Sequence, residues 1–275
     1  MRQWNRSELL RRADVAAGIC RQCRLCPRSC RADRSRETGF CGIGMSVRCF
    51  LEVLHFGEES ELNPSHQVYF AGCNLRCEFC ATEGWNLNPR HTPATDAAWL
   101  RARIRLRQEQ GAATLNLLGG EPTISLPGIL HLLADAPPGV CLVWNSNMYF
   151  SECAADLLAG VVDVYLADFK CWSAECAETM LGAKDYVETV RENLLFARRT
   201  ADLILRHLIM PGHFECCLKP IPGWVAREMP DVKLSLRGEY MPPARAATAP
   251  SRFLTDQEQD DARRLALEIN LTLVT

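Results

Sequence analysis

From about residue 66 onward, the chain alternates short apolar runs with segments of helical periodicity. Each apolar run has the length and composition of a β-strand, and a helix or a loop follows it. The expected strands are HQVYFAGC (66–73), TLNLLGGEP (114–122), VCLVWNSN (140–147), VVDVYLADFK (161–170), DLILRHLIMPGH (202–213) and VKLSLRGEY (232–240). Because strands that alternate with helices form βαβ units, the pattern predicts a parallel sheet. The fold class is therefore α/β, a partial (β/α)6 barrel of the TIM type.

Two stretches have the periodicity of amphipathic helices. One covers residues 95–110, and the other covers residues 255–269 near the carboxyl end. The second begins with Thr255 and has Glu258 three residues later, which is the capping-box pattern that satisfies free amide groups at a helix start. We expect this terminal helix to pack on the barrel.

The first 60 residues differ in composition from the rest of the chain. They are rich in arginine and include CRQCRLCPRSC, with Cys20, Cys23, Cys26 and Cys30, followed by Cys41 in GFCGIG. Cysteines this dense in a polar stretch indicate a metal site, because free cysteine otherwise behaves as a small core residue. Either Cys20 or Cys41 could be the fourth ligand. The chain thus divides into a cysteine-rich metal-binding module at 1–60 and a barrel at 61–275.

Composition narrows the class of protein. The chain has 275 residues, 48% of them hydrophobic and 23% charged, which is ordinary for a globular protein and excludes wholesale disorder. A formal net charge of −2 gives no reason to expect a nucleic-acid partner. The 15 cysteines lie in metal-type spacings in a long chain, which indicates a reducing, cytoplasmic setting. A signal-peptide pattern and an apolar run of about 18 residues are both missing, so no membrane partner is expected.

The strongest chemical signal is GCNLRCEFC, residues 72–80, in which Cys73, Cys77 and Cys80 have C-x3-C-x2-C spacing. Three thiolates this close can hold three irons of a cubane cluster, whereas an electron-transfer cluster normally has a cysteine for each iron. An iron without a protein ligand can bind a substrate or cofactor directly, as the open position of a catalytic zinc does. The loop therefore predicts a catalytic iron–sulfur centre, and a zinc knuckle is the competing interpretation.

Polar residues follow several predicted strands at their carboxyl ends. In GGEP, Gly119 and Gly120 allow the backbone to approach a ligand closely, and Glu121 can accept from an ammonium group. Ligands of parallel sheets bind outside the carboxyl ends of the strands, so these residues point to one shared site. Later strands contribute further polar residues to the same edge, namely Ser146, Asn147, Asp168, Lys170 and Arg206.

These motifs resemble those of the radical S-adenosylmethionine (SAM) enzymes. That family has the same C-x3-C-x2-C loop with an aromatic residue before the last cysteine, here Phe79, and a GGE motif one βα unit later. The resemblance implies a 4Fe-4S cluster on the three loop cysteines, whose open iron chelates the amino and carboxylate groups of SAM. One electron then splits SAM into methionine and a 5'-deoxyadenosyl radical, which abstracts hydrogen from a substrate.

The resemblance also implies roles for the strand-end residues. The two glycines and the glutamate of GGEP would bind the methionine part of SAM, and Ser146 or Asn147 would contact its ribose or carboxylate. Asp168 and Lys170 match a D-x-K element of activating enzymes. Together with Arg206 they would position the carboxylate of SAM or the substrate, while an ion pair that only caps the barrel is the alternative interpretation.

Within the family, the chain resembles proteins related to pyruvate formate-lyase-activating enzyme, of the PflX type. The similarity is carried by the C-x-L-C-P-R-x-C run with its following G-x-C, and by HFGEES, WNSNMY, DFK, RHLIMPGH and GEY. It favours Cys23, Cys26, Cys30 and Cys41 as the ligands of the N-terminal site, which would hold a second 4Fe-4S cluster or zinc. Ferredoxin-bearing activases place their extra cysteines after the core motif, so a glycyl-radical substrate is only one possibility.

The implied enzyme is oxidoreductase-like and needs an electron donor such as flavodoxin or ferredoxin. Its substrate is either a backbone glycine of a protein, which requires an open groove, or a small molecule or peptide, which requires a closed pocket. A non-enzymatic iron–sulfur or zinc protein would explain the cysteines but not the three-ligand loop with GGEP. Sequence assigns no role to Cys171, Cys216 and Cys217, and His213 is expected to be structural.

Overall fold

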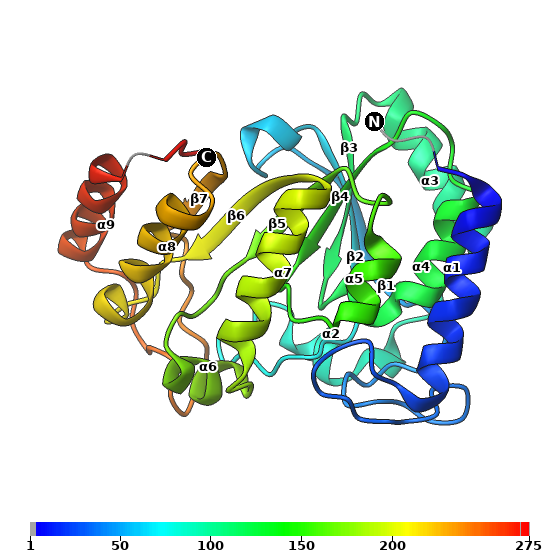
Figure 1. Cartoon of the computed structure of the whole chain (residues 1–275), viewed down its shortest axis with the longest axis horizontal. Coiled ribbons are helices and arrows are strands. Elements are labelled where there is room, and N and C mark those ends of the chain that lie inside the picture. Colours follow the sequence, from blue (N-terminus) through cyan, green and yellow to red (C-terminus); the bar gives the residue numbers. More distant parts are fainter. Residues whose placement is uncertain (1–3, 270, 275) are drawn as a thin grey trace.

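The computed structural model describes residues 4–269 and 271–274. A seven-stranded sheet forms its centre, and the strands lie side by side in the order β1 to β7 (Figure 1). β1 (Cys49–His55) runs antiparallel to β2 (Ser65–Phe70), and every later pair of neighbours is parallel. The predicted α/β class and partial barrel are confirmed, with one strand more than predicted.

The alternation of strands and helices matches the expected βαβ pattern. The remaining strands are β3 (Thr114–Gly119), β4 (Cys141–Ser146), β5 (Val164–Asp168), β6 (Asp202–Leu208) and β7 (Lys233–Arg237). The helices are α1 (Arg6–Ile19), α2 (Glu83–Leu87), α3 (Ala97–Glu109), α4 (Leu126–Ala134), α5 (Glu152–Leu158), α6 (Ala174–Leu181), α7 (Tyr186–Thr200), α8 (Pro220–Glu228) and α9 (Asp256–Glu268). Strand residues such as Val68, Trp144 and Leu205 are completely buried, because helices cover the sheet.

α3 and α9 confirm the two predicted amphipathic helices. The Asp96 carboxylate accepts from the Trp99 amide at 3.0 Å at the start of α3. At the start of α9, the Thr255 hydroxyl accepts from the Glu258 amide at 3.2 Å while the Glu258 carboxylate accepts from the Thr255 amide at 2.9 Å. The capping box read from the sequence is therefore present.

β1 is the strand that the sequence pattern did not predict. Its central residue Glu52 is buried and accepts from Arg103 and Arg107 of α3, both at 2.7 Å. The charged Glu52 interrupts the apolar run of this strand, CFLEVLH. The domain boundary predicted at residue 60 falls in the connection between β1 and β2.

The segment before β1 packs on the barrel at two places. α1 lies along α4 (Figure 1), and Arg12 of α1 donates to the carbonyls of Leu157 and Ala159 at 2.9 and 2.6 Å. Residues 23–47 form an irregular loop, held by bonds such as the one from the Cys23 amide to the Ala32 carbonyl at 3.0 Å. This loop lies at the same end of the molecule as α2 and α6 (Figure 1).

The carboxyl ends of the parallel strands meet at this end of the sheet. The GGEP, WNSN and DFK segments follow three neighbouring strands, and the register pairs Phe70 with Gly119 and Asp168 with Arg206. Residues far apart in sequence are thereby brought to one edge. Within the described part of the chain, no helix combines the length and apolar character needed to cross a membrane.

Candidate active site at the carboxyl ends of the strands

The three-cysteine motif lies on residues 71–82, the cluster loop, which connects β2 to α2. Cys73 is buried, and Cys77 and Cys80 are partly buried. The loop is held by α6, since the amides of Arg76 and Glu78 donate to the Leu181 and Met180 carbonyls at 3.0 and 2.9 Å. The cysteine positions are therefore fixed by backbone bonds to a neighbouring helix.

Nitrogen donors surround the loop sulfurs. The Leu75 amide and the Asn147 side chain lie 3.4 and 3.7 Å from the Cys73 sulfur, and the Asn86 amide group lies 3.3 Å from the Cys80 sulfur. Such hydrogen bonds are typical of iron–sulfur thiolates and tune their potential. Burial raises the pKa of Cys73, and it raises the pKa of Cys77 to about 12. The free thiols of Cys73 and Cys77 are therefore neutral at pH 7, so binding a metal there releases protons.

The three cysteines border a cavity of about 260 Å³ at the mouth of the barrel. Its wall contains most of the residues that the sequence assigned to cofactor binding. Those in the wall are Phe79, Gly119, Gly120, Asn147, Asp168, Lys170 and Arg206, and Asn145 joins them. Phe79 also packs against Tyr240, with ring centroids 6.4 Å apart, so the segment after β7 covers one side of the loop.

GGEP brings the end of β3 directly onto the cluster loop. A Cβ atom at Gly120 would lie 1.8 Å from the Gly72 carbonyl oxygen and 2.3 Å from Asn86 Oδ1, closer than atoms can approach. Gly119 has φ +118°, which an L side chain rarely adopts. The Glu121 amide donates to the Gly72 carbonyl at 3.0 Å. Both glycines are therefore required for this backbone contact.

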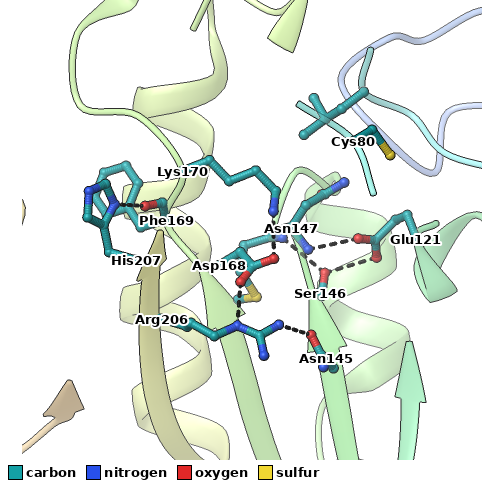
Figure 2. A network of polar contacts seen from close by, with 12 residues as sticks. Cys80, Glu121, Asn145, Ser146, Asn147, Asp168, Phe169, Lys170, Arg206 and His207 are labelled. Atoms are coloured by element: carbon teal, nitrogen blue, oxygen red, sulfur yellow. Dashed lines mark hydrogen bonds and ion pairs between the residues drawn. The ribbon is translucent and has the colours of Figure 1, made fainter. Parts of the chain in front are cut away.

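Glu121 is fully buried and organises the strand ends. Figure 2 shows that its carboxylate faces Ser146 and Asn147, and it accepts from the Ser146 hydroxyl and the Asn147 amide, both at 2.9 Å. A third donor, the Thr123 amide, lies 3.0 Å away. Burial raises the pKa of Glu121, and these donors oppose the shift. Glu121 and Ser146 thus lie behind the cavity wall, and their contact with SAM stays a prediction.

The predicted Asp168, Lys170 and Arg206 form one ion-pair network (Figure 2). Asp168 accepts from Lys170 Nζ at 2.6 Å and from Arg206 Nε at 2.8 Å. Burial alone would raise the pKa of Asp168, but the two cations outweigh it and lower that pKa. Asp168 in turn raises the pKa of both cations against the effect of burial. All three groups are ionised at neutral pH.

Arg206 also has partners that sequence reasoning did not assign. Its Nη2 donates to Asn145 Oδ1 at 2.8 Å, and its Nη1 lies 3.0 Å from a carboxylate oxygen of Glu58 and 3.9 Å from one of Glu59. Glu58 and Glu59 belong to HFGEES, which sequence used only as a family signature. β1 runs antiparallel to β2 and ends beside the amino end of β2, so Glu58 and Glu59 reach Arg206 from the end of the sheet opposite the cluster loop. The motif was visible in the sequence, but its place in the fold was not.

The end of β6 is fixed to the end of β5 by a separate contact. The ring nitrogen Nδ1 of His207 lies 2.7 Å from the Phe169 carbonyl oxygen (Figure 2). Burial lowers the pKa of His207, so the ring is neutral at pH 7 and donates this hydrogen bond. The contact holds Arg206 and Asp168 at their paired positions, next to each other in the sheet.

The N-terminal cysteines lie beside the cluster loop. Arg28, which lies between Cys26 and Cys30, donates to the Asn74 carbonyl of the cluster loop at 2.9 Å. A Cβ atom at Gly39 would lie 3.1 Å from the Cys30 sulfur and 3.7 Å from the Cys41 sulfur, so these two thiols are near each other. A hydrogen bond from Cys20 lowers the pKa of Cys23 to about 5. Burial raises the pKa of the remaining predicted ligand, Cys26, to about 12.

Comparison with known proteins identifies the family. A model of the radical SAM superfamily matches residues 68–221, more than half of the chain. The chain belongs to this superfamily. An uncharacterized protein of Methanocaldococcus jannaschii, MJ0674, is 34% identical to this radical SAM protein over 273 residues, which cover 96% of this chain and 79% of the relative.

Solved structures of radical SAM enzymes have a similar fold. SuiB of Streptococcus suis, bound to S-adenosylmethionine, has a TM-score of 0.52 and 15% identity, covering 73% of this chain and 47% of SuiB. HydG, a maturase of the FeFe hydrogenase, has a TM-score of 0.55 and 12% identity, covering 98% of this chain and 63% of HydG. The chain spans less than two thirds of either protein, and at these identities the likeness is one of fold.

The protein is therefore a radical SAM enzyme, whose family uses a 4Fe-4S cluster and SAM. Its own residues fit both groups. Three thiols border a cavity, and those of Cys73 and Cys80 have nitrogen donors, as suits a three-ligand cluster. In the cavity wall, the buried Nδ2 of Asn145 has no hydrogen-bond partner among the described residues, so a bound ligand could accept from it.

Proposed function

We propose that Cys73, Cys77 and Cys80 bind a 4Fe-4S cluster and that the adjoining cavity binds SAM. When bound, the cluster supplies the electron that splits SAM into methionine and a 5'-deoxyadenosyl radical. The observation that carries the proposal is the cavity of about 260 Å³, which the three thiols and the charged strand ends share. No general base is needed for a homolytic cleavage, so the protein contributes orientation and exclusion of water.

Different residues of the cavity wall contribute to the orientation of SAM in different ways. Gly119 and Gly120 offer backbone without a side chain in the way, which suits a ligand lying flat against the end of β3. Arg206 and Lys170 place two cations in the wall, and either can attract the carboxylate of SAM. Asp168 holds both cations in place, because it accepts from each. Glu121 acts as a positioning residue for Asn147.

Loss of one cluster ligand provides the test. Anaerobically reconstituted protein with dithionite and SAM should release 5'-deoxyadenosine, and Cys77→Ala should lower the release rate at least about a hundredfold, because even outer-shell changes at metal sites cost 10- to 100-fold. Cys141→Ala is the matched control, since Cys141 lies at the amino end of β4, away from the cavity. Unchanged release from the Cys77→Ala variant would disprove the assignment.

Two substrate classes remain predictions, and one feature favours a polypeptide. A second cavity of about 590 Å³ adjoins the three cysteines, and its lining includes the exposed residues Glu83, Leu87 and Arg245. A site bordered by exposed residues can admit a backbone segment, as the activase-like reaction requires. A small molecule or peptide bound in a closed pocket is the competing class. In the same assay, a deuterated substrate is recognised by the deuterium that it passes to 5'-deoxyadenosine.

We also propose that Cys23, Cys26, Cys30 and Cys41 bind a second 4Fe-4S cluster. Arg34 supports this, because its buried guanidinium lies 3.6 Å from the Cys20 sulfur and 3.9 Å from the Cys23 sulfur, where it can balance the charge of metal-bound thiolates. Because Arg34 contacts both sulfurs, Cys20 lies next to the proposed site without being one of its four ligands. Alanine at Cys73, Cys77 and Cys80 together should leave about four irons per chain, whereas no remaining iron would refute the second cluster.

A further inference from the structure

A third group of metal-type ligands lies away from both sites. The donor atoms of Cys176, His213, Cys216 and Cys217 all lie within 4.8 Å of one another. This four-donor group joins the start of α6 to the turn that precedes α8. Sequence reasoning assigned it no role, because Cys176 is separated from the others by more than thirty residues.

Local structure fixes each donor. Cys176 lies in the first turn of α6, where the Ser173 hydroxyl accepts from its amide at 3.3 Å. His213, Cys216 and Cys217 come from one π-helical turn, in which the Cys217 amide donates to the His213 carbonyl at 3.1 Å. Positions three and four residues apart on a helical turn share one face. The turn therefore presents three donors to the single donor of α6.

The spacing of the donors fits a single tetrahedral ion. Zn–S bonds of about 2.3 Å and Zn–N bonds of about 2.0–2.1 Å place neighbouring ligand atoms roughly 3.5–3.8 Å apart. The Cys176 and Cys216 sulfurs are 3.8 Å apart, and the Nδ1 atom of His213 lies 3.6 and 3.3 Å from them. Ligands of a cubane cluster bind different irons and must be farther apart. The group is thus too compact for a second cubane.

We propose that Cys176, His213, Cys216 and Cys217 bind one structural Zn²⁺ ion. Four protein ligands leave no open position, so the site has no catalytic role of its own. The proposal does not depend on the proposed SAM chemistry. The Trp172 amide donates to the Cys217 sulfur at 3.4 Å, which orients this ligand from outside the group.

The position of the ion gives it a function in the fold. α6 carries Cys176 near its start, and the carbonyls near its end, Met180 and Leu181, accept from the cluster loop. Zinc would join α6 to the turn after β6 and so hold the helix against which the cluster loop lies. Loss of zinc should therefore lower thermal stability and loosen the cluster loop, although the ion lies outside the cavity.

Metal analysis of full-length protein, produced with zinc in the medium, tests the proposal. Wild-type protein should hold about one zinc per chain, and Cys176→Ser should hold about none. Cys153→Ser is the matched control, because Cys153 contacts Ser151 and the Arg24 carbonyl rather than the four-donor group, and it should retain the ion. Wild-type protein without zinc overturns the proposal, and so does zinc that persists in Cys176→Ser.

Substitutions of His213 test whether this residue binds the metal or only packs in the fold. His213→Cys keeps four donors of a zinc site and should retain the ion, whereas His213→Ala should weaken zinc binding by about 10-fold or more. Cobalt(II) bound to wild-type and His213→Cys proteins should give thiolate-to-cobalt absorption, and His213→Ala, which keeps three thiols, should need about 10-fold or more cobalt to reach the same absorption. Equal metal affinity of the alanine and cysteine variants contradicts ligation by His213. A Cys176–Cys216 disulfide in anaerobically purified protein contradicts the site as a whole.

Discussion

The two ends of α6 support two different kinds of sulfur site. Near its end, the helix holds the cluster loop, whose three thiols border a cavity. At its start, it contributes Cys176 to the four-donor group, whose ligand atoms face one another within 4.8 Å. The first arrangement leaves coordination to be completed by a ligand, and the second completes it with protein. The difference is the one that separates catalytic from structural metal sites.

The two sites also differ in what keeps them in shape. The four-donor group depends on one helix, one turn and the ion that we propose between them. The open site depends on contacts made without a metal: the glycines of GGEP against Gly72, and the ion pairs of Asp168, Lys170 and Arg206. It should therefore be sensitive to changes in packing and in charge that leave the closed site intact.

The largest effect is expected from Gly120→Ala. Its Cβ atom would meet the Gly72 carbonyl oxygen at 1.8 Å, and backbone cannot move aside as a flexible side chain can. The cluster loop must shift, at a cost of about 3 kcal/mol of unfolding free energy. Displacement of reacting groups by about 1 Å costs on the order of a hundredfold in rate. We expect that loss in 5'-deoxyadenosine release, with zinc content unchanged.

Gly223→Ala is the matched control for this substitution. Gly223 lies inside α8, and a Cβ atom there would meet nothing within 4 Å. Alanine in a helix interior should stabilise the protein by roughly 0.5–1 kcal/mol relative to glycine. If Gly120→Ala kept wild-type activity, or if it lost zinc together with iron, the separation between the open and the closed site would be wrong.

The comparison also shows what sequence can reveal. Cys73, Cys77 and Cys80 lie within one loop, so their spacing alone is enough to propose them as a ligand set. The βαβ pattern predicted that Asp168 and Arg206 would share one edge of the sheet, and the two residues form an ion pair there. The four-donor group had no such signal, because only the packing of α6 against the turn after β6 brings its members together. For a parallel sheet, order along the chain predicts which strand ends meet, but not which helices do.

The sequence also does not predict the direction in which a side chain at a strand end points. GGEP predicted that the backbone at Gly119 and Gly120 approaches a ligand closely, and the structure shows Gly120 against the Gly72 carbonyl. The carboxylate of Glu121 is directed to Ser146 and Asn147 (Figure 2). Sequence gives the position of a residue at a strand end but not the partners that satisfy it. Glu58 illustrates the same limit, because it reaches Arg206 only through the connection that follows β1, and that strand was not predicted.

The smallest effect is expected from Glu58→Gln. This substitution tests whether a buried charge next to Arg206 affects the open site. Burial raises the pKa of Glu58 to about 7, while Arg206 opposes the shift and Glu59 adds to it. Its carboxylate also accepts from Gln67 and Asn116. The folded chain thus binds a proton more tightly than the unfolded chain, whose Glu58 has the ordinary pKa of 4.5. Below pH 4.5, Glu58 is protonated in both states and does not lower the free energy of unfolding. Above about pH 7 it is ionised in both states and lowers that free energy by the full amount.

Wild-type stability should therefore fall relative to that of Glu58→Gln as the pH rises from about 4.5 to 7, by about 1–3 kcal/mol. Thermal melting of both proteins across this range, in the same metal-loaded state, measures the change. Glu61→Gln is the control, because Glu61 is an exposed residue paired with Lys233, and its profile should follow wild type. A constant difference between wild type and Glu58→Gln at every pH would mean that Glu58 contributes packing rather than a titrating charge to the open site.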